Sequence, residues 1–114
     1  MLPYCKVAKN EDAYHMRFVR VKAQVQFRHG DMFIHEDCDP VEALESWVQI
    51  DDAARLDELL RSDPFQEKTA YAIVEGEFDA KHSLGCYGPK FRIIASKIKL
   101  ISPLQDVVAQ PRTE

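Results

Sequence analysis

Two histidines and two cysteines have the residue types and spacing of zinc ligands. His35 and Cys38 are separated by two residues, and His82 and Cys86 by three. Imidazole nitrogen and thiolate sulfur are ligands that zinc accepts in tetrahedral sites. Both pairs follow predicted strands, so they would meet if their loops share one end of a barrel. The alternative is that the imidazoles form hydrogen bonds within their own loops and the thiols are passive.

A second set of residues could bind an extended ligand by stacking and charge. Aromatic side chains stack on bases or on other flat groups, and nearby cations attract phosphates. Trp47 alternates with Val48, which points the indole away from a core, although it could also pack under a helix. An acidic run from Glu36 to Asp39 would repel phosphates. The ligand-binding candidates are Arg28, Phe33, Trp47, His82, Tyr87, Lys90 and Arg92.

A catalytic centre is not indicated. Cys86 and His82 have the types of a nucleophile and its base, but both fall in one loop and no third group orients them. The acidic run lacks the glycine and the distal glutamate of a calcium loop. The sequence has no phosphate-binding loop and no dinucleotide fingerprint. We therefore expect a protein that is not an enzyme and that carries no cofactor.

Composition limits the class of protein. The chain has 114 residues, of which 46% are hydrophobic, so it predicts one domain with a real core. Its formal net charge of −4 weighs against binding to duplex DNA. Three cysteines do not form a disulfide framework, so we expect reduced thiols, with one pair and one free thiol as the alternative.

The start of the chain does not resemble a signal peptide. Lys6, Lys9 and Glu11 follow the first five residues and interrupt any apolar region. No apolar run approaches the length of about 18 residues that predicts a membrane span. These features favour a cytoplasmic location and predict no membrane-spanning segment.

The elements that position these candidates are mostly strands. Residues 17–28 alternate apolar and polar side chains strictly, which predicts a half-buried strand. A turn at 29–31 leads into a short strand at 32–35. After a loop at 36–42, residues 44–50 predict a third strand.

A helix and two longer strands complete the predicted order. Asp51 is a good N-cap for a helix that ends before Pro64. Strands at 69–79 and 91–101 flank a glycine-containing loop. Gly76 fits a barrel corner, and the broken alternation near Ala95 predicts a bulge.

The order strand, strand, strand, helix, strand, strand predicts an all-β fold with one helix, a five-stranded OB-like Greek-key barrel. An SH3-like barrel or an open sheet is the alternative. The chain is predicted to be a single domain over 1–114. Its core covers about 17–102, with an N-terminal extension at 1–13 and a flexible tail at 105–114.

Several segments resemble a group of small, functionally uncharacterised bacterial OB-like domains. The resemblance covers about Val19 to Ile101, and its motifs are structural. It implies the barrel fold but brings no activity and no catalytic residues. The matching segments are Phe18 to Ala23, Glu36 to Cys38, Trp47-Val48, Val74 to Phe78, and His82 to Gly88.

The favoured function is a non-catalytic binding module for a protein or a small ligand. Tyr71, Ile73, Phe91 and Ile93 are predicted to form an exposed apolar patch, which favours a protein partner or a homodimer. Single-stranded nucleic-acid binding is the first alternative. A zinc-binding domain is the second.

Overall fold

The structure is a computed structural model, and it describes residues 1–28, 31–38, 42–50, 67–81 and 89–106. Its described elements are two short helices and seven strands that belong to one sheet. In chain order they are β1 (Leu2–Pro3), α1 (Tyr4–Ala8), α2 (Glu11–Tyr14), β2 (Arg17–Arg28), β3 (Asp31–Cys38), β4 (Glu42–Ile50), β5 (Lys68–Asp79), β6 (Phe91–Leu100) and β7 (Gln105–Asp106).

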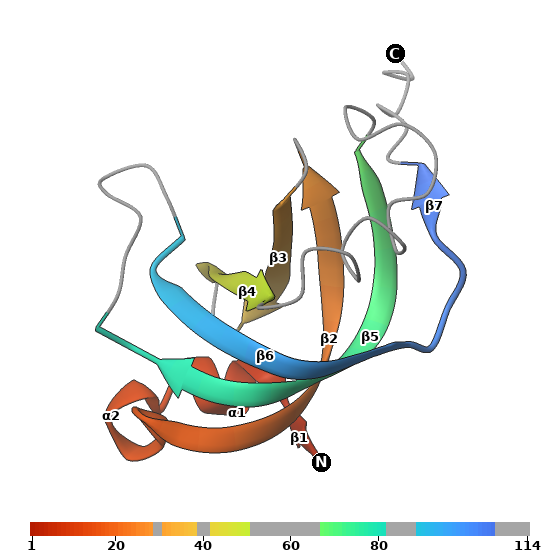
Figure 1. Cartoon of the computed structure of the whole chain (residues 1–114). Helices are drawn as coiled ribbons and strands as arrows, with labels where there is room; N and C mark the ends of the chain where they lie inside the picture. Colours follow the sequence, from red (N-terminus) through yellow and green to blue (C-terminus); the bar gives the residue numbers. More distant parts are fainter. Residues whose placement is uncertain (29–30, 39–41, 51–66, 82–88, 107–114) are drawn as a thin grey trace.

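Five of the strands close into a ring (Figure 1). The neighbours run in the order β2, β3, β4, β6, β5, and β5 pairs again with β2. All contacts in the ring are antiparallel except β4 with β6, which is parallel. The two-residue strands β1 and β7 add to β2 and β5. The prediction of a mostly β protein is confirmed, and the ring has five strands, although the described sheet has seven strands where five were predicted.

The strand predicted at 17–28 has the predicted bounds. Its alternate residues Val19, Val21 and Val25 are buried in the barrel, and the residues between them face outward. This strand pairs with β5 along nearly its whole length, from Arg17 opposite Phe78 to Phe27 opposite Lys68. The alternation of apolar and polar residues therefore predicts both the strand and the face of it that is buried.

The hairpin of β3 and β4 extends further than predicted. A loop was predicted to begin at Glu36, but Asp37 and Cys38 pair with Ala43 and Glu42 in the ladder. Polar side chains can occupy the outward positions of a strand in an exposed hairpin. The polar residues from Glu36 were therefore taken too early as the end of the strand. The predicted turn at 29–31, the predicted helix from Asp51 and the loop at 82–88 lie wholly or mostly outside the described residues.

Gly76 lies where the backbones of β5 and β6 approach each other closely. A Cβ added at this glycine would collide with the carbonyl oxygen of Ile94 and would lie 2.8 Å from the Cα of Ala95. The ladder shifts register at the same point, because Gly76 pairs with Ala95 while Glu75 pairs with Lys97. Ser96, which lies between Ala95 and Lys97, is therefore an extra residue in β6, and the bulge predicted near Ala95 is confirmed.

The bulge reverses which residues of β6 face the core. Before it, Phe91 and Ile93 are buried, with 1% and 0% of their surface exposed, and after it Ile98 is buried. The rings of Phe78 and Phe91 lie 5.3 Å apart inside the barrel. The prediction that Phe91 and Ile93 are exposed is therefore wrong, because it carried the alternation of the second half of the strand back through the bulge.

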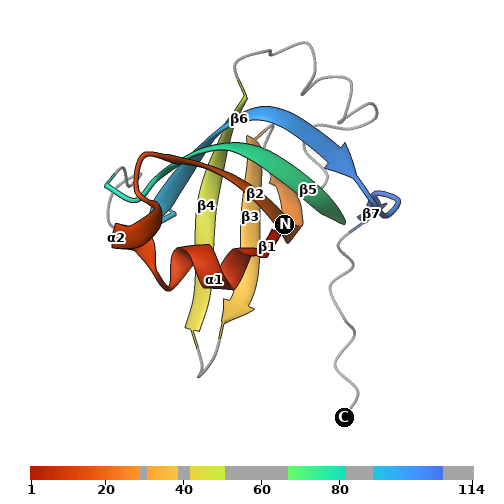
Figure 2. The ribbon, with the colours of Figure 1, turned by 90° about the horizontal axis from the view of Figure 1, so that it is seen from below.

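The N-terminal segment packs beneath the ring, as Figure 2 shows for α1 and α2. Tyr4, Val7 and Ala8 of α1 are buried in the same core as the strands. Cys5 forms a disulfide with Cys38, with the two Cα atoms 5.6 Å apart. The expectation of reduced thiols is wrong for these two cysteines, and the alternative of one pair holds.

Among the described helices, none has the length and apolarity needed to cross a membrane.

Candidate functional site

Three of the candidate side chains lie next to one another across the outside of the barrel. Phe33 of β3 pairs with Trp47 of β4, and Trp47 pairs with Arg92 of β6. They face outward because their neighbours in each strand, such as Ile34 and Val48, are buried. We call Phe33, Trp47 and Arg92, together with Arg28, the Trp47 row.

Arg28 joins the row by lying over an aromatic ring. Its guanidinium carbon is 4.4 Å from the ring centroid of Phe33, a distance typical of cation–π contact. Its Nη2 also donates to the carboxylate of Glu45, at 3.3 Å. The same carboxylate lies 2.6 Å from Nδ1 of His35. Glu45 therefore holds both a guanidinium and an imidazole beside the aromatic pair.

Arg92 is fixed from the other side of the row. It donates to Asp79 at 2.7 Å and to Gln49 at 3.1 Å. Burial alone would raise the pKa of Asp79. The backbone N–H of Lys81, the Arg92 guanidinium and the nearby His15 outweigh burial and hold the pKa of that carboxyl below its usual value. Asp79 is thus ionised at neutral pH and anchors Arg92.

The charges of the Trp47 row are matched rather than in excess. Glu45 faces Arg28, and Asp79 faces Arg92. Each arginine also has a buried Nε atom without a hydrogen-bond partner in the described part of the chain. The row is therefore a half-buried aromatic pair flanked by two oriented guanidinium groups, with little net charge.

Lys90 lies apart from the row, in an open cleft. Its Nζ is 3.9 Å from a carboxylate oxygen of Glu11 and 5.4 Å from the ring centroid of Phe91. The cleft has a volume of about 580 Å³. Its lining residues are Ala8, Lys9, Asn10, Glu11, Asp12, Ala13, Leu44 and Lys90. Its charged lining residues are two lysines and two acids, so it has no dominant charge.

The four predicted zinc ligands are not brought together by what the structure describes. The sulfur of Cys38 is bonded to Cys5, and His35 contacts Glu45. His82 and Cys86 lie outside the described residues, as does the binding candidate Tyr87. Within the described ranges, no three His, Cys, Asp or Glu side chains gather as a metal site would require. Zinc binding stays a prediction that needs Cys38 in its reduced state.

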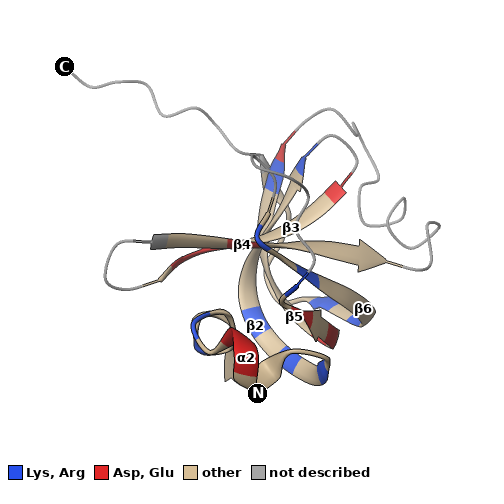
Figure 3. Cartoon of the chain, turned by 90° about the vertical axis from the view of Figure 1, so that its left-hand side faces the viewer, with Lys and Arg blue, Asp and Glu red and all other residues tan. Residues whose placement is uncertain are grey.

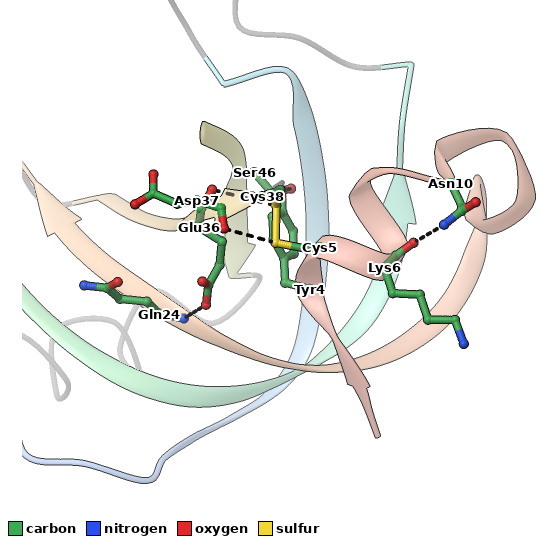
Figure 4. The surroundings of a disulfide bond; sticks show 9 residues. All are labelled: Tyr4, Cys5, Lys6, Asn10, Gln24, Glu36, Asp37, Cys38 and Ser46. Carbon is green, nitrogen blue, oxygen red and sulfur yellow. Dashed lines mark hydrogen bonds between the residues drawn. A yellow bond between two sulfur atoms is a disulfide. The ribbon is translucent and has the colours of Figure 1, made fainter. Parts of the chain in front are cut away.

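The N-terminal segment is held by a buried polar contact that was not predicted from the sequence. The hydroxyls of Tyr4 and Ser46 share a hydrogen bond at 2.5 Å in the core, beside the disulfide (Figure 4). Burial raises the pKa of Tyr4 far above its usual value, so its hydroxyl stays neutral. The spacing of Tyr4, Val7 and Ala8 at i, i+3 and i+4 was the signal for a short helix with one buried face.

No protein-family model, curated protein or solved structure matches this chain.

Proposed function

We propose that the protein is a non-catalytic OB-fold binding module that recognises a segment of another protein through the Trp47 row. The ring order and the single parallel contact between β4 and β6 support the OB-fold, since they are the Greek-key connectivity of that barrel. The resemblance of residues 19–101 to bacterial OB-like domains agrees with this assignment. The proposal for the ligand depends on the row itself.

The observation that carries the proposal is the adjacency of Phe33 and Trp47 with an arginine on each side. Tryptophan and arginine are the residue types that most often dominate binding energy at protein interfaces. Both guanidinium groups are already oriented by carboxylates, so little side-chain freedom would be lost on binding. Such a surface suits a peptide that offers an apolar side chain and hydrogen-bond acceptors.

Nucleic acid fits the Trp47 row less well than a peptide. A phosphate would compete with Glu45 for Arg28 and with Asp79 for Arg92. Glu36 and Asp37 extend the acidic character along β3. Phosphate binding is favourable when free protein cations displace the counterions condensed on the nucleic acid, and these arginines are already neutralised by carboxylates. The aromatic pair keeps single-stranded nucleic acid as the alternative ligand of this row.

A displayed library of random dodecapeptides tests the proposal. We expect sequences to be enriched on the immobilised wild-type protein and to lose at least tenfold in affinity for a Trp47→Ala variant. Phe33→Ala should reduce affinity for the same peptides, because the two rings form one platform.

Tyr71→Ala is the matched control. Tyr71 is an aromatic residue on another part of the barrel, with 50% of its surface exposed, and its removal should leave peptide binding unchanged. Circular dichroism of each variant checks that the barrel is folded. A library with no enrichment on the wild type, or peptides that bind Trp47→Ala equally well, would refute the proposal.

A further inference from the structure

A second face of the barrel carries a concentration of positive charge. On the outside of β2, β5 and β6, one register row contains Arg20, Glu75 and Lys97, and the next contains Lys22, Ile73 and Lys99. Figure 3 marks lysine and arginine in blue along β2 and β6, while α2 is red. We call Arg20, Lys22, Lys97 and Lys99 the basic face.

Most of these cations are not neutralised. Arg20 pairs with Glu75 at 3.1 Å. Among the described residues, Lys22, Lys97 and Lys99 have no carboxylate within ion-pair distance, and Lys97 and Lys99 are exposed. The arginines of the Trp47 row, by contrast, are both paired with acids. In a chain with a net charge of −4, this face is therefore locally positive.

Exposed aromatic rings lie at the two ends of the basic face. Phe18 is 66% exposed one row before Arg20, and Tyr71 is 50% exposed one row beyond Ile73. This confirms the exposed position predicted for Tyr71. Exposed rings beside unpaired cations are the combination that binds single strands, since bases stack on rings while phosphates meet cations.

A shallow depression lies at the centre of this face. It has a volume of about 90 Å³, and its lining residues are Arg20, Ile73, Glu75, Lys97 and Lys99. That volume is roughly that of three water molecules in the liquid. Its three cations outnumber the carboxylate of Glu75, which is paired with Arg20, so the depression can hold one oxyanion group of a larger ligand.

The shape of the face favours a flexible ligand. β2 and β5 turn together through a sharp bend (Figure 1), so the face does not lie in one plane. A flat membrane surface would contact only part of it. A flexible chain can follow the strands, along which outward side chains recur about every 6.7 Å.

We propose that the basic face binds single-stranded nucleic acid, with the lysines and Arg20 on phosphates and with Phe18 and Tyr71 stacked on bases. This site is separate from the Trp47 row and takes a different ligand. One chain could therefore hold a protein segment and a nucleic-acid strand at the same time.

Fluorescence anisotropy with a labelled fifteen-nucleotide oligo(dT) tests the proposal. We expect affinity that falls steeply between 50 mM and 200 mM salt. Lys97→Gln/Lys99→Gln should weaken binding at low salt at least tenfold and reduce the slope of log K against log salt by about 1.4, since each single-strand phosphate contact contributes about 0.7. Phe18→Ala should weaken binding with little change in that slope.

The matched control removes two other exposed lysines. Lys6→Gln/Lys81→Gln changes net charge by the same amount but leaves the basic face intact, so binding should fall less than threefold. Trp47→Ala should bind the oligonucleotide as the wild type does, which separates this proposal from the peptide proposal.

Three results would overturn the proposal. One is the absence of any anisotropy change at 50 mM salt. Another is equal loss of binding in the two double-lysine variants, which would mean that only overall charge matters. The third is binding to vesicles containing phosphatidylglycerol with no binding to oligo(dT).

Discussion

At the scale of single residues, the buried pair of Tyr4 and Ser46 joins the N-terminal segment to the barrel. Both residues are almost fully buried, with 1% and 0% of their surface exposed, and their hydroxyls satisfy each other. The Trp47 row differs, because its two arginine side chains are partly exposed, at 29% for Arg28 and 22% for Arg92. The Tyr4–Ser46 pair stabilises the fold, whereas the Trp47 row is available to bind a ligand.

Replacing Tyr4 with Phe should lower the free energy of unfolding by about 1–3 kcal/mol, because the Ser46 hydroxyl loses its partner in the core. Urea denaturation measures the change. The double variant Tyr4→Phe/Ser46→Ala should recover part of the loss, since both polar groups are then removed. A double variant less stable than Tyr4→Phe by a further 1 kcal/mol would contradict this account of the pair.

The pKa of Asp79 predicts a loss of stability in acid. Its folded pKa lies below the usual value of 3.8, so the unfolded chain takes up the proton first. The stabilisation is present above about pH 4 and is lost as the pH falls through the lower folded pKa. Thermal melting from pH 6 to pH 2.5 should therefore show a decline that is weaker in Asp79→Asn. An unchanged decline in that variant would assign acid sensitivity to other carboxylates.

Part of the candidate site was predictable from residue types. Phe33, Trp47, Arg28 and Arg92 were chosen because aromatics and arginines bind, and the structure brings them together. Their pairing with Glu45 and Asp79 was not predictable, since it depends on which residues become neighbours across strands. Lys90, which was predicted as a binding residue with them, faces the cleft instead.

At the scale of elements, alternation predicted strands well and short helices poorly. The strand at 17–28 was read correctly because one face is apolar throughout. α1 and α2 have five and four residues, which is too short for periodicity to be decisive, and tertiary contacts stabilise them. The inward residues of β6 were misassigned because one extra residue at the bulge reverses every side chain before it.

Gly76→Ala tests the close crossing of β5 and β6. The new methyl group would meet backbone atoms of Ile94 and Ala95, which cannot rotate away as a side chain can. We expect a loss of about 1–3 kcal/mol in unfolding free energy, measured by urea denaturation. Ser96→Ala, at the exposed bulge position, is the control and should cost less than 1 kcal/mol. Equal stability of Gly76→Ala and wild type would contradict the crossing geometry.

The disulfide between Cys5 and Cys38 closes a loop with a sequence separation of 33 residues. In the chain-entropy model, its removal should lower the free energy of unfolding by about 3–4 kcal/mol. We therefore expect Cys5→Ser/Cys38→Ser to unfold at lower urea concentration than the oxidised wild type. Reductant should destabilise the wild type and leave the variant unchanged. Equal effects of reductant on both proteins would show that the bond does not stabilise the fold.

At the scale of the whole molecule, charge is segregated between faces. A net charge of −4 argued against binding to duplex DNA, yet unpaired lysines gather on the outside of β2 and β6. Net charge could not reveal this, because only the strand register places Lys22, Lys97 and Lys99 together. The disulfide also weighs against the cytoplasmic location favoured by the sequence, because such bonds persist mainly in oxidising compartments.

The most direct test of the binding-module proposal is a two-dimensional NMR titration with one peptide selected on the wild-type protein. We predict that backbone amide shifts concentrate in residues 31–35, 45–49 and 91–93, around the Trp47 row. Shifts that concentrate instead in residues 18–22 and 71–75, or that spread evenly over the barrel, would contradict a ligand site at Phe33 and Trp47.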